Sequence, residues 1–324
     1  MLRILFWSAI VAVSAAGYNV ILKRASQRFI FSFWVALCTF LSMTTLFYIK
    51  HLDQGINFLA TTTRLGSLVI SNTPFYMILI VLMVLQIALK TYLFGKHTLG
   101  KIIPILEIGT PLTASLYFLM GNTITLLQAL GIGIISCGAA ISGFEKLEFP
   151  NILKPFTRLP YRLYVCGITM ACLATGENLI VYITTKQTAV TESFMHFFKN
   201  TPFLEQFRFC FMSPLEYFEV ASIFFVSGFF LYLFLFSTYT LRDLGRCFMQ
   251  EKKLIFWGAA VNTLSQYTYY FIYAGNKQSI VVALAKFSIP LTLAFAYLTF
   301  KDRILLPEKV GVTLILFGGF LAAF

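Results

Sequence analysis

The residues best placed to do chemistry are four charged side chains inside long apolar runs: Lys90, Glu107, Glu177 and Lys286. A charge at the centre of a membrane helix costs roughly 2.5–3.5 kcal/mol on insertion scales, so each needs a reason. Glu107 and Lys286 each stand four residues before a proline. If equivalent, they can pair across a cavity and part to bind a zwitterion or an anion, or they can form a permanent structural bridge.

Amide side chains accompany two of these charges. Asn19 and Asn178 end a Gly-x-Asn motif that occurs twice, and Glu177 lies inside the second copy. These asparagines can line a pore or bond one helix to another, at about 0.6 kcal/mol per bond in membrane interiors. Glu177 is a candidate proton carrier.

Two polar stripes run along otherwise apolar segments. Gln86, Lys90 and His97 share one helical face, and a second face carries Asn262, Gln266, Tyr270 and Tyr273. Lipid does not tolerate such stripes, so we expect them to face inward. Lys90 can alternatively reach the membrane surface along its carbon chain.

The composition requires a membrane environment for these segments. Apolar residues make up 58% of the 324 residues and charged residues 12%, against about 45–50% and about 25% in soluble domains. The mean hydropathy is +0.80. Because the apolar runs are continuous rather than alternating, the sequence predicts an all-α integral membrane protein.

Ten transmembrane helices are predicted, at 2–22, 29–49, 75–94, 102–120, 125–143, 163–185, 217–241, 254–274, 279–299 and 309–324. The first resembles a signal peptide, but its Gly-x-Asn motif recurs in the sixth segment, so we expect a retained helix. The connections 50–74 and 186–216 are not expected to span. The second is an amphipathic segment at the membrane interface or an ordered loop on the bundle.

The ten segments fall into two homologous halves. Residues 101–143 and 280–321 share a Pro-Leu-Thr helix, a polar turn and a Gly-rich helix, which aligns Gly131 with Gly311 and Gly138 with Gly318. Gln86 likewise aligns with Gln266. The predicted division is a five-helix repeat at 1–149, a proline-punctuated linker at 150–162 and a second repeat at 163–324.

The formal net charge of +12 indicates loop lysines and arginines that set topology, rather than nucleic-acid binding. These residues gather in the odd-numbered connections, which the positive-inside rule assigns to the cytoplasm. Both termini are therefore expected on the non-cytoplasmic side. The lack of a disulfide pattern fits a bacterial inner (plasma) membrane.

This pattern over essentially the whole chain resembles the drug/metabolite transporter superfamily, particularly its EamA-like members. The resemblance implies alternating access around a central cavity formed by the first, third, fourth, sixth, eighth and ninth helices. It makes the fifth and tenth helices peripheral. The prolines of the repeat, Pro111 and Pro290, are the candidate hinges of such a motion.

The leading hypothesis is a secondary transporter for a small polar metabolite, either an amino acid-like zwitterion or a small organic anion. The alternatives are an exporter of amphipathic or drug-like compounds, a membrane scaffold, and a lipid-processing protein. No Walker-type motif is present, and histidines, cysteines and acids lack metal-ligand spacing. We therefore expect no enzyme activity, cofactor, metal or nucleic acid, and a monomer or homodimer in contact with lipid and a small-molecule substrate.

Overall fold

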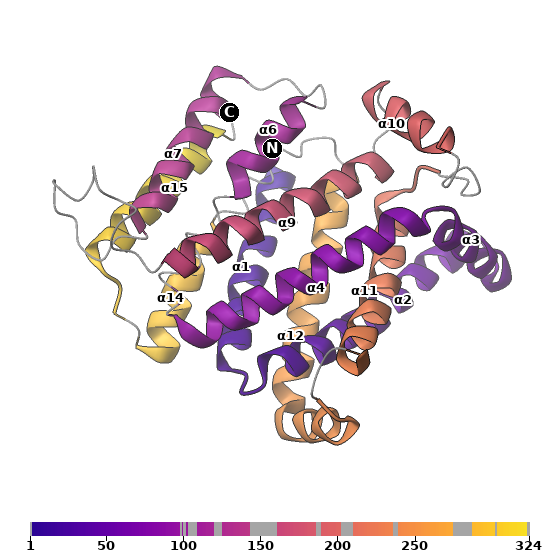
Figure 1. The fold of residues 1–324 in the computed structure, drawn as a ribbon, viewed down its shortest axis with the longest axis horizontal. Helices are drawn as coiled ribbons and strands as arrows, with labels where there is room; N and C mark the ends of the chain where they lie inside the picture. The colour runs from indigo at the N-terminus through magenta and orange to yellow at the C-terminus, as the bar shows by residue number, and fades with distance from the viewer. Residues whose placement is uncertain are drawn as a thin grey trace.

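A computed structural model describes residues 2–97, 99, 102, 109–119, 125–142, 161–185, 189–201, 210–235, 239–274, 287–301 and 303–322. All regular secondary structure in these ranges is α-helical (Figure 1). The helices are α1 Leu2–Arg24, α2 Arg28–Asp53, α3 Phe58–Ser71, α4 Thr73–Lys96, α6 Gly109–Leu119, α7 Leu126–Ser142, α9 Tyr161–Thr185, α10 Ala189–Lys199, α11 Pro214–Leu235, α12 Leu241–Ala274, α14 Ser288–Phe300 and α15 Leu306–Ala322.

The membrane character of the chain is clear from these helices. Five of them contain stretches long and apolar enough to cross a bilayer, and they are α1, α2, α4, α9 and α11. Leu126–Gly138 and Ser288–Phe300 are shorter apolar helices. Every one of the ten predicted segments overlaps a helix, and the all-α class is confirmed.

The long connections differ most from the predicted elements. Residues 50–74 contain α3, which places Thr61, Leu65 and Leu68 against the bundle. Residues 186–216 contain α10, whose Thr191 is buried while Phe197 is 67% exposed. Each is therefore an amphipathic helix packed on the bundle. The location of α10 at the membrane interface stays a prediction.

Helix α12 begins well before the predicted start at 254, because a capping box begins it. Asp243 Oδ2 accepts hydrogen bonds from the Thr240 backbone N–H at 2.9 Å and hydroxyl at 2.7 Å. The Trp34 indole N–H donates to the Leu244 carbonyl at 3.0 Å and attaches this polar first part to α2. A hydropathy pattern does not detect such a start, whereas Thr-x-x-Asp is a local signal for it.

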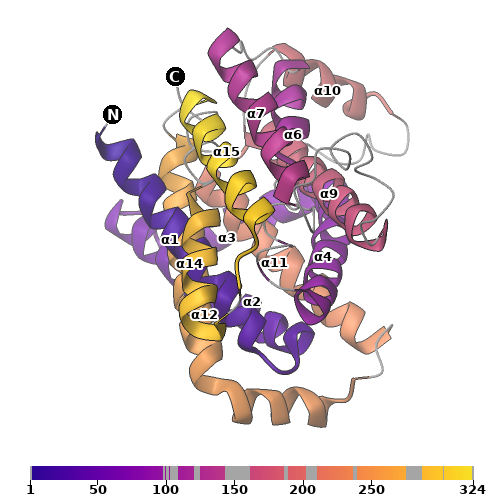
Figure 2. The same cartoon turned by 90° about the vertical axis from the view of Figure 1, so that its left-hand side faces the viewer.

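Helices α7 and α15 pack backbone to backbone (Figures 1 and 2). A Cβ built on Gly131 would lie 2.5 Å from the Gly318 carbonyl oxygen, and one on Gly138 would lie 2.6 Å from that of Gly311. A side chain in the first turn of each helix caps its start. Gln128 Oε1 accepts a hydrogen bond from the Thr125 N–H at 3.0 Å, and Glu308 Oε2 accepts one from the Leu305 N–H at 2.8 Å. Small residues thus bring these helices into close contact.

The remaining bundle is built from helix pairs distant in sequence. Helix α1 packs on α12 and α14, and α9 packs on α4 and α6. Helix α2 contacts α12, α11 contacts α4, and α2 and α11 contact each other. One end of the α2–α11 contact is an aromatic cluster, in which Phe29 and Phe33 lie 4.8 and 5.6 Å from the ring of Phe229.

Candidate binding cavity

A cavity of about 180 Å³ lies inside the bundle, between α1, α2, α4, α9, α11 and α12. Its wall is mixed, with apolar side chains such as Leu22, Met83 and Phe225. The polar or charged lining residues are Tyr18, Ser32, Gln86, Lys90, Thr91, Glu177, Asn262 and Gln266. Five of the predicted site residues therefore line one cavity, although they come from three helices.

The carboxyl group of Glu177, on α9, is held in the cavity wall by a side chain of α4. The Gln86 side-chain N–H donates to Glu177 Oε2 at 3.0 Å, which joins α4 to α9. Both residues are half-buried. A carboxyl group held in this way presents an acceptor to the cavity while keeping one polar partner in the protein.

Lys90 supplies the positive side of the same cavity. Its Nζ lies 5.2 Å from the centroid of the Tyr18 ring and 5.5 Å from that of Phe94. Cations within about 6 Å of an aromatic ring are attracted by the ring's quadrupole. This position favours the inward-facing hypothesis for Lys90, which lines the cavity; the alternative that it reaches the membrane surface stays a prediction.

The amides of α12 complete the wall. Asn262 donates through its side-chain amide to the Thr39 hydroxyl at 3.2 Å, which ties α12 to α2. Gln266, one turn further along, also lines the cavity. The helical spacing that predicted an inward polar face on this segment therefore agrees with the position of these two residues.

Other predicted residues lie elsewhere or cannot be placed. Asn178 donates to the Ala174 carbonyl of its own helix at 2.9 Å, and Asn19 is half-buried on α1. Neither is among the described lining residues of the cavity. Glu107, Lys286 and the side chain of Tyr270 lie outside the described residues, so their pairing and orientation stay predictions.

The prolines occupy matching places. Within the described residues, Pro111 is the third residue of α6 and Pro290 the third residue of α14. A proline in a first turn removes no helical hydrogen bond. Residues 103–108 and 275–286 lie outside the described ranges, so the hinge hypothesis stays a prediction.

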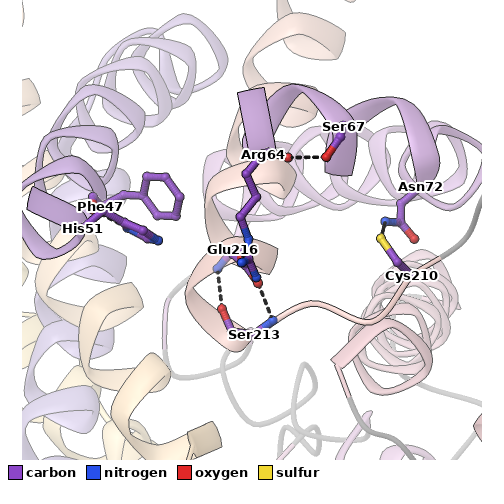
Figure 3. A network of polar contacts seen from close by, with 8 residues as sticks. All are labelled: Phe47, His51, Arg64, Ser67, Asn72, Cys210, Ser213 and Glu216. Atoms are coloured by element: carbon purple, nitrogen blue, oxygen red, sulfur yellow. Dashed lines mark hydrogen bonds and ion pairs between the residues drawn. The ribbon is translucent and has the colours of Figure 1, made fainter. Parts of the chain in front are cut away.

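Sequence reasoning missed two buried acids at the start of α11. Glu216 is 4% and Glu219 1% exposed. Glu216 binds Arg64 of α3 (Figure 3), and Glu219 accepts a hydrogen bond from the Thr44 hydroxyl at 2.6 Å. The sequence contained only a weak signal for them, because both acids stand at the edge of an apolar run rather than inside it.

Comparison with known proteins does not assign this chain to a family. No protein-family model matches the chain, and no curated protein matches its sequence. Within the described residues, no group of three or more histidine, cysteine or acidic side chains could hold a metal ion. The resemblance to drug/metabolite transporters therefore rests on the sequence pattern alone.

Proposed function

We propose that this protein is a secondary transporter that carries a small polar solute across a membrane, and that it is a carrier rather than an enzyme. The observation behind the proposal is the cavity inside the bundle, where Lys90 and Glu177 both contribute to the wall. Buried charges are costly in a membrane protein. Two charges of opposite sign, accompanied by amides, provide a site for a solute that carries both signs itself.

The size of the cavity favours a metabolite over a drug-like compound. Its volume of about 180 Å³ is below the roughly 300–1,000 Å³ of typical ligand pockets. An amino acid-like zwitterion fits this chemistry, with its carboxylate toward Lys90 and its ammonium toward Glu177. A small organic anion would use Lys90 and the two α12 amides instead.

Two homologous five-helix halves, at 1–149 and 163–324, are the proposed basis of the mechanism. In the proposed alignment, α9 corresponds to α1, α12 to α4 and α14 to α6. The contacts then occur in matching pairs: α1 packs on α12 as α9 packs on α4, and α1 packs on α14 as α9 packs on α6. Gly131 meets Gly318 while Gly138 meets Gly311, as a pseudo-twofold axis requires of glycines that align 180 residues apart. Ten spans in two inverted repeats would let the halves alternate access to a site between them.

The proposed location is a bacterial inner membrane with both termini outside the cytoplasm. In Figure 2, the two termini lie at one end of the bundle, and the start of α12 lies at the other. That start carries exposed basic side chains, which are Arg242, Arg246, Lys252 and Lys253. Basic residues at membrane boundaries favour the cytoplasmic side.

The test is a ligand screen by thermal shift on detergent-purified protein. Candidate amino acids and small organic anions are added to the wild type, Lys90→Gln and Glu177→Gln. A ligand at 100 times its Kd stabilises the native state by about 2.7 kcal/mol. We expect a compound class that raises the melting temperature of the wild type and of neither variant.

A matched control is Lys253→Gln, which removes an exposed charge of α12 and should respond to ligand like the wild type. If no compound shifts the wild type while both cavity variants melt lower, the charges serve a structural role. That result would favour the scaffold alternative. A shift caused only by amphipathic compounds would favour the exporter of drug-like molecules.

A further inference from the structure

Two glutamates one turn apart on α11 have opposite surroundings. Both carboxylate oxygens of Glu216 are satisfied: Oε1 accepts from Arg64 Nε at 2.5 Å, and Oε2 accepts from the Ser213 backbone N–H at 2.8 Å (Figure 3). Ser213 and Glu216 form a capping box. Glu216 is therefore fully explained by the start of α11 and the attachment of α3.

Glu219 has no such explanation. Its Oε1 accepts the Thr44 hydroxyl at 2.6 Å, and its Oε2 is fully buried without a hydrogen-bond partner among the described residues. The neighbouring Val220 and Ala221 are buried in an apolar cluster. No described lysine, arginine or histidine lies within ion-pair distance of Glu219.

The polar groups of the packed elements are committed elsewhere. On α2, the His51 ring contacts the Phe47 carbonyl at 2.9 Å, and on α3, Arg64 binds Glu216. On α4, the Tyr76 hydroxyl lies 3.6 Å from Met212 Sδ. The Tyr48 hydroxyl of α2 lies 2.9 Å from the Thr62 hydroxyl, and the Cys210 sulfur accepts from the Asn72 amide at 3.5 Å. Tyr217 of α11 and Tyr182 of α9 are further titratable side chains in this cluster.

An ionised carboxylate in such surroundings costs several kcal/mol unless a cation accompanies it. The lone buried oxygen and the Thr44 hydroxyl are hard oxygen ligands, which suit a proton or a small alkali cation. Helix α11 also reaches the solute cavity, because Phe225 lines it. Binding of a cation at Glu219 can therefore influence the cavity through α11, which contributes to both sites.

We propose that Glu219 and Thr44 form a binding site for a monovalent cation, H⁺ or Na⁺, whose movement drives the transport. The coupling part rests on the proposed function, whereas the cation site itself does not. The site lies at the α2–α11 contact and is separate from the solute cavity, since neither residue lines that cavity.

The experiment is labelling with dicyclohexylcarbodiimide, an apolar reagent that reacts with protonated buried carboxyl groups. The carboxyl O–H adds across one N=C bond, and the acyl group then migrates to nitrogen as an N-acylurea. The protein gains the mass of one whole reagent molecule and nothing leaves. Peptide mass spectrometry of the detergent-purified full chain locates and quantifies the adduct.

If the cation is a proton, labelling of Glu219 falls by about tenfold per pH unit once its carboxyl ionises, whether the salt is sodium or choline chloride. If it is Na⁺, sodium chloride suppresses the label and choline chloride at the same pH does not. Glu219→Gln removes the label. Glu216, equally buried on the same helix but paired, is the internal control that stays unlabelled.

Two results overturn the cation site: no labelling of Glu219 at any pH, or labelling that neither pH nor Na⁺ changes. Thr44→Val is the second variant, and the proposal requires it to weaken Na⁺ protection or move the pH at which the label is lost. Coupling is tested separately with a solute found by the thermal-shift screen. Glu219→Gln should keep the ligand-induced shift and lose concentrative uptake in proteoliposomes; unchanged accumulation excludes coupling and leaves transport intact.

Discussion

At the scale of single residues, the cavity depends on a few polar side chains that hold one another in place. Glu177 depends on Gln86, because the Gln86 amide is the described donor to its carboxyl group. Asn262 depends on Thr39 in the same way. Such bonds between helices keep costly polar groups satisfied inside an apolar bundle.

Gln86→Leu should therefore destabilise the protein and weaken ligand binding. The substitution leaves the half-buried Glu177 carboxyl without its α4 donor, at a cost of roughly 1–3 kcal/mol. The measurement is the melting temperature with and without ligand. Asn178→Leu is the control, because the hydrogen bond described for the Asn178 side chain lies within its own helix, and it should cost less. Equal losses in the two variants would contradict the special role of the Gln86–Glu177 bond.

The sequence was a good guide to the cavity where it contained a periodic signal. Gln86 and Lys90 stand one turn apart, as do Asn262 and Gln266, so helical spacing alone grouped them on inward faces. Glu219 escaped because it lies near the end of its apolar run, where a charge costs little if solvated. The tertiary structure, in which Glu219 is 1% exposed and accepts a hydrogen bond from Thr44, shows that it is buried.

At the scale of helices, close packing through glycine holds α7 against α15. Gly138→Ala should cost roughly 1–3 kcal/mol, because the new Cβ would lie 2.6 Å from the Gly311 carbonyl oxygen and force the helices apart. The readout is the thermal unfolding midpoint. Gly133→Ala in the same helix meets nothing within 4 Å and should be neutral or slightly stabilising. A loss at Gly133 as large as at Gly138 would exclude helix contact as the cause.

The stability of the start of α12 should fall at acid pH. The Thr240 backbone N–H and hydroxyl, which bond the Asp243 carboxylate, lower the pKa of Asp243 below its ordinary value of 3.8. A lowered folded-state pKa contributes stability above the unfolded value, and this stability is lost as pH falls through the folded pKa. Amide hydrogen exchange at residues 241–247 should accelerate below about pH 4, after correction for intrinsic rates. Asp243→Asn should remove that step, and a step that persists would assign it to another group.

Hydropathy located the apolar helices because burial in lipid requires length and apolar surface, but it did not locate α3 or the start of α12. For α10 it gave only an amphipathic segment or an ordered loop somewhere in 186–216. Helices α3 and α10 are amphipathic, the first part of α12 is polar, and both α3 and α12 begin at side-chain caps. Asn57, for example, begins α3 by accepting the Ala60 N–H at 2.7 Å. Capping residues can be recognised in the sequence because they act locally. Which face of a helix packs against a neighbour depends on the whole bundle.

At the scale of the whole molecule, the paired contacts and the charge distribution point to one arrangement. Helix α2 connects the two ends of the bundle: its start lies by α12, where Ser26 N–H binds Glu251 at 2.8 Å, and its end leads to α3. Exposed basic side chains gather at the start of α12, and the proposed orientation assigns this end to the cytoplasm by the positive-inside rule. In the orientation proposed above, the α3 end and both termini face the opposite compartment.

This arrangement predicts which engineered cysteines an impermeant maleimide can reach in intact cells. Asn57 and Arg242 are both exposed, so Asn57→Cys and Arg242→Cys form a matched pair in a background without the six native cysteines. Asn57→Cys should react from outside, and Arg242→Cys only after the membrane is permeabilised. The opposite pattern would invert the orientation. Reaction of both in intact cells would mean that α2 does not cross the bilayer, because the start of α2 contacts α12 through Ser26 and Glu251 while its end leads to Asn57. The proposed ten-span arrangement would then fail as well.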